Sequence, residues 1–165
     1  MENPQRPLVN QRLYFCRLHL KWMEQALEAG EITRHIVEQS FSESVLFHLV
    51  MAYRVYLAEI ATAYGSACDH LDDVTALQQL LAQQQLESAE ASEIAELQES
   101  GWLQHLLFAY ESIPTMGSQA QSSLKPEVIP VTQLQQPVIG LDQYKSLLES
   151  LEKLIENQRN RLEEW

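Results

Sequence analysis

Side chains that commonly bind transition metals occur along the chain, but their spacing is unfavourable for a shared ion. The candidate ligands are His48, Glu59, Asp69, His70, Asp72, Asp73 and His105. Imidazole and carboxylate groups suit zinc, iron and manganese. The chain has neither the Glu-x-x-His pairs of a di-iron bundle nor a His-x-x-x-His motif. His48 and Glu59 share a helical face but lie three turns apart. We therefore expect no metal site and no cofactor, and we interpret Asp69 to Asp73 as a helix-capping turn.

A second kind of chemistry is suggested by Arg12 and His19, which have six residues between them. Some helical ribonucleases use an arginine and a histidine a short distance apart on one helix. A step of seven residues returns to nearly the same helical face, so this gap is compatible with such a pair. Chance alone often produces this spacing, and an acidic chain is a poor host for RNA. We expect both side chains to border the buried stripe and to keep their polar ends in water.

Nucleophilic catalysis has no recognisable motif here. The sequence lacks a Gly-x-Ser-x-Gly elbow and a phosphate-binding glycine loop. Cys16 and Cys68 have no obvious base beside them and are too few for a disulfide framework, so we expect two reduced thiols that pack as small apolar groups. We therefore do not expect an enzyme.

Arg54 interrupts the most apolar run of the chain, Phe47 to Ile60. A buried arginine without a partner is very costly, so its position predicts an ion pair with a carboxylate of another helix. The alternative is a surface arginine on a narrow polar face.

The elements that must position these groups are predicted to be helices. Leu13, Cys16, Leu20, Met23 and Leu27 step by three and four residues between Leu8 and Ala29, and Gly30 follows as a stop signal. A second helical region is predicted for residues 31–64, with a broad apolar stripe at Leu46, Leu49, Tyr53, Tyr56, Ile60 and Tyr64. Ser40 and Glu43 have capping-box spacing, which predicts that its strong part begins near Phe41.

Shorter helices are predicted after Asp72 or Asp73 and after Ser88, two residue types that cap helices. Gly101 leaves open whether residues 88–113 form one helix or two. Residues 114–140 contain four prolines and predict an extended crossover, with residues 128–139 docked along the protein. A last helix is predicted for residues 141–165.

Together these elements predict an all-α fold in one domain, residues 1–165, with a short tail at residues 1–7. We expect a bundle of about four main helices plus short ones, with the long proline-containing crossover loop before the C-terminal helix. The segments Asn10–Phe15 and Phe47–Ile60 resemble a small family of bacterial, pseudomonad-like helical proteins with no assigned activity. This resemblance implies a helical fold and a bacterial cytosol, and no reaction.

Charge is the most uneven property of the chain. Ten carboxylates and no lysine or arginine lie between Val55 and Leu124, which we call the acidic block, and the formal net charge of the chain is -12. Such a field disfavours nucleic acid and anionic membranes. It favours a non-enzymatic interaction or regulatory domain that binds a basic protein partner. The interaction candidates recur every three residues, as Glu87, Glu90, Glu93, Glu96 and Glu99.

Two further alternatives stay open. A small-ligand or metal-binding bundle predicts a polar pocket near His48, Tyr53, Arg54 and His105, and the C-terminal helix predicts either a monomer or a homodimer paired through that helix. The N-terminus lacks a signal-peptide pattern, and no segment reads as a transmembrane span, so a cytoplasmic location is expected.

Overall fold

The computed structural model describes residues 3–113 and 139–163. Within these residues it contains six helices and no strand, which confirms the all-α prediction. The helices are α1 (Arg6–Ala29), α2 (Arg34–Ala63), α3 (Val74–Gln83), α4 (Ala89–Ser100), α5 (Trp102–Glu111) and α6 (Leu141–Glu163). Residues 114–138, which hold most of the predicted crossover and its docked half, lie outside the described residues.

The first two helices form a long antiparallel pair joined by a short turn. Gly30 has a left-handed backbone, with φ of 66°, and ends α1 as its sequence position predicts. The predicted second helical region, residues 31–64, corresponds to α2. Only the expectation that its strong part begins near Phe41 is wrong, because α2 runs unbroken from Arg34 after the extended residue Thr33. The Ser40 hydroxyl donates to the carbonyl of Val37 at 2.9 Å and does not cap a helix. This backbone contact is the usual one for a serine inside a helix.

Two of the short helices, α3 and α4, begin where the capping residues predict. The Asp73 carboxylate accepts from the amide of Ala76 at 2.9 Å, and the Ser88 hydroxyl oxygen accepts from the amide of Ala91 at 3.1 Å. Gly101 separates α4 from α5, so residues 88–113 form two helices. A Cβ on Gly101 would lie 2.9 Å from the carbonyl oxygen of Leu97, which explains why only glycine fits this corner.

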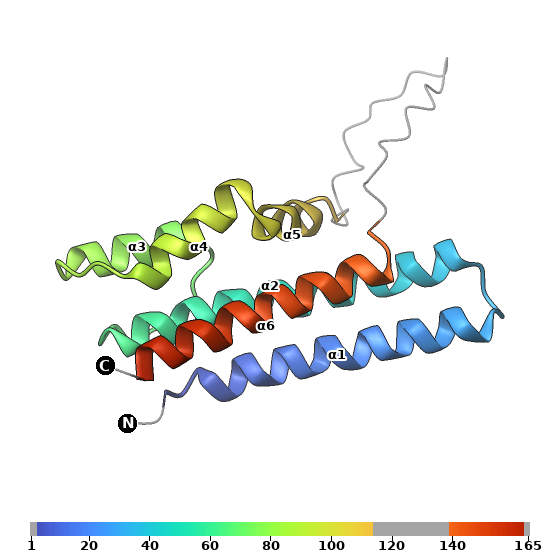
Figure 1. The fold of residues 1–165 in the computed structure, drawn as a ribbon, viewed down its shortest axis with the longest axis horizontal. Coiled ribbons are helices and arrows are strands. Elements are labelled where there is room, and N and C mark those ends of the chain that lie inside the picture. The colour runs from blue at the N-terminus through green and yellow to red at the C-terminus, as the bar shows by residue number, and fades with distance from the viewer. Residues whose placement is uncertain (1–2, 114–138, 164–165) are drawn as a thin grey trace, which may run out of the picture.

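The bundle is built around α2. This helix contacts α1, α3, α5 and α6, and Figure 1 shows α2 and α6 between α1 on one side and the short helices on the other. The predicted stripe residues Leu46, Leu49, Tyr53, Tyr56 and Ile60 are all buried. In length and composition α2 is apolar enough to cross a membrane, so the expectation that no segment reads as such a span needs correction. Because 67% of its apolar window is buried inside the protein, this apolar character is also what a central helix of a bundle requires.

The last helix, α6, packs its apolar stripe against α1, α2 and α5. Its buried residues are Leu141, Tyr144, Leu147, Leu148, Leu151, Leu154, Ile155 and Gln158. A homodimer paired through α6 would need this same stripe, which the chain already uses to close its own bundle.

Candidate interaction surface

The candidate metal-ligating side chains do not converge on one site in the described part of the chain. Among the described residues no group of three or more His, Cys, Asp and Glu side chains is arranged to hold a metal ion. Asp73 is occupied as a helix cap, and Glu59 is bound by an arginine. Asp69, His70 and Asp72 are exposed in the turn before α3, and His105 lies on α5.

The five glutamates of α4 and its N-terminal flank do not form one acidic surface. Glu90 is 5% exposed and accepts from the hydroxyls of Tyr64 at 2.8 Å and Ser88 at 2.9 Å. Glu93 pairs with Arg161 of α6, which together with nearby side-chain hydrogen bonds outweighs the effect of burial and lowers the Glu93 pKa. Only Glu87, Glu96 and Glu99 remain exposed, because a three-residue spacing turns the series around the helix.

Arg54 does not form the predicted ion pair. Its Nε atom donates to the backbone carbonyl of Asp72 at 3.2 Å, and its guanidinium lies over the ring of Tyr110, 5.7 Å from the centroid. Within residues 3–113 and 139–163 no carboxylate is within ion-pair distance of it. The side chain is half-buried beside the turn before α3, where a carbonyl and a ring take the place of a carboxylate.

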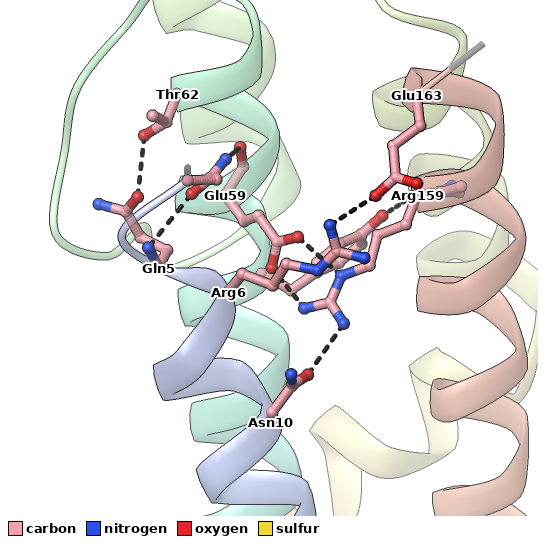
Figure 2. Close-up of polar contacts among 10 residues, drawn as sticks. Gln5, Arg6, Asn10, Glu59, Thr62, Arg159 and Glu163 are labelled. Atoms are coloured by element: carbon pink, nitrogen blue, oxygen red, sulfur yellow. Dashed lines mark hydrogen bonds and ion pairs between the residues drawn. The ribbon is translucent and has the colours of Figure 1, made fainter. Parts of the chain in front are cut away.

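The buried ion pair of α2 is formed instead by Glu59, five residues further on. Arg159 of α6 donates from Nε and Nη2 to the two carboxylate oxygens of Glu59, both at 2.7 Å. Its Nη1 donates to Oδ1 of Asn10 on α1 at 2.9 Å, as Figure 2 shows. The side chains of Arg159 and Glu59 are 13% and 6% exposed. One guanidinium therefore connects α1, α2 and α6.

Further polar contacts at this end of the bundle are also internal. The Gln5 amide donates to the carbonyl of Cys68 at 2.8 Å and accepts from the Thr62 hydroxyl, while Arg6 pairs with Glu163 (Figure 2). These contacts hold both ends of the described chain and the C-terminal part of α2 together. Because the groups satisfy one another, we assign this end a structural role.

Neither cysteine is an activated nucleophile. Both thiols are free. Burial raises the pKa of the Cys16 thiol to about 12, and burial also raises the pKa of the half-buried Cys68. A thiolate is the reactive form, so these environments oppose nucleophilic chemistry.

A continuous run of rings crosses the outer side of α1 and α2. We call it the aromatic face and define it as Tyr14, Phe15, His19 and Trp22 on α1 with Phe47 and His48 on α2. The His48 ring contacts Phe15, Phe47 and His19 at centroid distances of 5.5, 5.4 and 5.0 Å. His19 in turn contacts Trp22 at 5.4 Å, and Phe15 contacts Tyr14 at 6.3 Å.

The aromatic face is open to solvent. Tyr14 is 54% exposed, Trp22 48% and Phe47 41%. Single exposed apolar residues are ordinary on a protein surface, but a contiguous group indicates a binding surface. The apolar stripe predicted for α1 covers only its inward side, so it gave no signal for these outward rings.

Arg12 and His19 both belong to this side of α1, as their spacing predicts. The Arg12 guanidinium lies over the Phe47 ring, 5.7 Å from its centroid. The Ser44 hydroxyl donates to the carbonyl of Phe41 at 3.0 Å, so its oxygen accepts from Nδ1–H of His19, 2.7 Å away. The two side chains are thus engaged by α2 on the same surface.

His48, within the aromatic face, makes the stability of the fold sensitive to acid. Its Nδ1 atom is buried without a hydrogen-bond partner among the described residues. Burial, and after it the charges of His19 and Arg12, lower the pKa of His48. The unfolded chain therefore binds a proton at this residue more readily than the folded chain, so acid favours unfolding.

We expect the stability that neutral His48 contributes to be present at pH 7 and to be lost as the pH falls below about 6.5, the ordinary histidine value. Urea unfolding of wild type and His48→Leu at pH 7.0 and 5.5, on either side of the ordinary histidine pKa of about 6.5, measures the effect. The loss of stability on acidification should be smaller in His48→Leu than in wild type. His70→Leu, which removes an exposed histidine, is the control and should behave as wild type. Equal losses in wild type and His48→Leu would contradict the expectation.

The surroundings of the aromatic face are poor in carboxylates, although the exposed Glu43 lies one turn before Phe47 on the same side of α2. Residues 8–23 of α1 and 44–58 of α2 contain no aspartate or glutamate, although the chain carries a net charge of -12. The cations of these two segments near the face are Arg12, Arg17 and Lys21, of which Arg17 pairs with Glu152 of α6, while Arg54 contacts the turn before α3. This surface therefore differs in charge from the rest of the molecule.

A separate cavity of about 350 Å³ lies between α5 and α6. Its lining residues are Trp102, His105, Phe108, Ile139, Gln143, Ser146 and Leu147. Of the four residues expected around a polar pocket, only His105 lines it. The cavity is mainly apolar, with three polar side chains at its wall.

Comparison with known proteins identifies a family without identifying an activity. The chain belongs to the family described as "Family of unknown function (DUF6586)", whose model matches residues 1–165. No curated protein and no solved structure matches the chain.

Proposed function

We propose that this member of the DUF6586 family is a non-enzymatic association domain that binds another macromolecule through the aromatic face. The observation that carries the proposal is the contiguous run of rings from Tyr14 to Trp22, of which three are roughly half exposed. Large aromatic side chains provide much of the binding energy at protein interfaces, because they bury a large area at small entropic cost.

Support also comes from how the ionisable groups are used elsewhere. Glu59, Glu90 and Glu93 are engaged with Arg159, Arg161 and Tyr64, and these contacts hold helices together. These three carboxylates are therefore not free for acid–base chemistry. A role in binding accounts for both the occupied polar groups and the open rings.

The aromatic face replaces the acidic block as the leading contact surface. With Glu90 buried and Glu93 paired with Arg161, only Glu96 and Glu99 of α4, and Glu87 before it, are exposed and unpaired. A basic partner for Glu87, Glu96 and Glu99 is therefore the weaker form of the same proposal. We place this activity in a bacterial cytoplasm, which fits the absence of a disulfide between Cys16 and Cys68.

Site-specific photo-cross-linking in cells tests the proposal. A photoreactive amino acid is introduced in place of Trp22 and, as a control, in place of Phe108, an exposed aromatic residue on α5. We expect a discrete, irradiation-dependent adduct from position 22 and none from position 108. Equal adduct patterns at the two positions, or no adduct from position 22, would contradict a binding role for the aromatic face.

The cavity between α5 and α6 favours a second candidate function, the binding of a small apolar ligand. Its volume of about 350 Å³ is at the lower end of ligand pockets, and Gln143 and Ser146 offer hydrogen bonds. A thermal-shift screen of small aromatic compounds, with Leu147→Trp to fill the cavity, tests this candidate. A hit that raises the melting temperature of wild type and not of the variant would support it, and a screen without hits would reject it.

A further inference from the structure

His48 lies at the centre of the aromatic face. Its ring contacts Phe15 and His19 of α1 and Phe47 of α2 at centroid distances of 5.5, 5.0 and 5.4 Å. Among the described residues, every contact between a ring of α1 and a ring of α2 involves His48. The rings of the two helices therefore form one surface only while the His48 ring stays in this position.

The position of His48 suits a neutral imidazole and opposes a charged one. Its Nδ1 atom is buried and has no hydrogen-bond partner in the described part of the chain. In the charged form both ring nitrogens carry a proton, so Nδ1–H would be a buried donor without an acceptor. The positive charge would also be partly removed from water, which is unfavourable when no anion pairs with it.

The charged groups around His48 do not compensate a proton there. Burial lowers the pKa of His48 most, and the charges of His19 and Arg12 on α1 lower it further. On α2 the exposed Glu43 comes five residues before His48, whereas side chains that meet on a helix are three or four residues apart. Within residues 3–113 and 139–163 no carboxylate lies within ion-pair distance of His48.

We propose that His48 is a pH switch of the aromatic face: the face is closed around the neutral ring near neutral pH and opens in mild acid, while the helices stay folded. The inference rests on the proposed function and names the regulation of that surface. A charged His48 ring gains water as a partner by turning outward, and this movement breaks its contacts with Phe15, His19 and Phe47. Because His48 is only partly buried, the movement needs a new side-chain rotamer and no change in the helix. A partner bound across both helices is then released.

The direction of the switch follows from proton linkage. The open form takes up its proton at the ordinary histidine value of about 6.5, and the closed form takes it up only at lower pH. The closed face is therefore favoured above about pH 6.5. Below that value, each pH unit raises the ratio of open to closed face by about tenfold, until the closed form is itself protonated.

Hydroxyl-radical footprinting of the purified full chain at about pH 7.5 and about pH 5.5, on either side of the ordinary histidine value, tests the inference. The rings that report opening are Phe15 and Phe47, which His48 contacts, and Phe108 on α5 reports any general effect of pH. His48→Phe keeps a ring at this position and cannot take up a proton. The matched control is His70→Phe, which makes the same change at an exposed histidine.

In wild type and His70→Phe, acid should raise the oxidation of Phe15 and Phe47 relative to Phe108 by about twofold or more, because the open face gains up to about tenfold in weight. In His48→Phe the oxidation should be the same at both pH values, and His48→Leu serves if that variant does not fold. Unchanged oxidation in wild type, or an equal rise in the folded His48 variant, would overturn the inference. Loss of the far-ultraviolet circular dichroism of wild type in acid would also overturn it, because the helices would then unfold together with the face.

Photo-cross-linking from position 22 separates this inference from the proposed function. A cell extract that contains the chain is irradiated at the same two pH values. The adduct should be lost in acid and retained when His48→Phe is added. An adduct that persists in acid without His48→Phe would overturn the regulation and leave the proposed function standing. No adduct at either pH would reject the proposed function, whereas the footprinting of the purified chain needs no partner and still decides whether His48 opens the face.

Discussion

Arg159→Met is expected to lower the free energy of unfolding by about 3–5 kcal/mol, the usual cost of breaking a buried ion pair from one side. The substitution leaves the Glu59 carboxylate, 6% exposed, without the two hydrogen bonds that Arg159 donates at 2.7 Å. It also removes the contact to Asn10 that connects α1 to α6. The loss follows mainly from an unpaired buried charge, and less from the attraction between the pair.

A double-mutant cycle separates these contributions. Glu59→Leu alone should also destabilise the protein, because Arg159 then lies buried without the carboxylate that accepts its hydrogen bonds. The double variant Glu59→Leu/Arg159→Met should recover much of the loss, since an apolar pair of similar volume needs no partner. Urea unfolding at pH 7 measures all forms.

The exposed pair of Arg17 with Glu152 supplies the control for this cycle. Arg17→Met should cost at most about 1 kcal/mol, as surface pairs do. If Arg159→Met cost no more than Arg17→Met, the assignment of a buried structural role to Arg159 would be contradicted.

Gln158→Leu is expected to cost about 2 kcal/mol, because it removes the partners of several buried groups at once. Gln158 is fully buried on α6. Its Oε1 accepts from the Tyr56 hydroxyl at 3.0 Å, and its Nε2 donates to the carbonyl of Glu90 at 3.3 Å and to the Glu93 carboxylate at 3.0 Å. Burial raises the pKa of Tyr56, so the orphaned hydroxyl would stay protonated and unsatisfied.

Tyr56→Phe provides the matched control for Gln158→Leu. In the double variant the missing hydroxyl no longer needs a partner. The double variant should therefore lose less stability than the two single variants lose together. Chemical denaturation of the four proteins gives the coupling free energy. Strict additivity would contradict the hydrogen bond between Tyr56 and Gln158.

The helices could be predicted from the sequence wherever their ends depend on local chemistry. Asp73, Ser88 and Gly30 each act through backbone groups within a few residues of themselves, so their position in the sequence suffices. The strong part of α2 was placed too late, near Phe41, because Ser40 has the spacing of a cap while its hydroxyl bonds inside the helix. Local spacing does not reveal which of two uses a serine has.

The ion pairs could not be predicted, because they join helices that are far apart in the sequence. An arginine in the apolar run pointed to a buried pair at Arg54, yet the pair forms between Glu59 and Arg159, a hundred residues apart. The inward turn of Glu90 depends likewise on Tyr64 of α2. Such contacts are fixed by the relative rotation of packed helices, about which the periodicity of one helix says nothing.

The aromatic face was missed for a related reason. Phe15 and Trp22 lie beside the predicted core stripe of α1. From the sequence, an aromatic residue next to such a stripe is interpreted as the edge of the buried face. Their exposure depends on whether another helix covers the outer side of α1 and α2. The tertiary arrangement places α6 and the short helices elsewhere and leaves these rings open.

Hydroxyl-radical footprinting read by mass spectrometry measures whether a partner covers the aromatic face. The oxidation of Tyr14, Trp22 and Phe47 is compared with that of Phe108 in two samples. One is a dilute solution of the chain, and the other is a concentrated native extract that contains it. A binding role predicts that the three rings of the aromatic face become protected in the concentrated extract while Phe108 stays equally reactive. Unchanged oxidation of all four residues would show that nothing covers the aromatic face and would contradict the account.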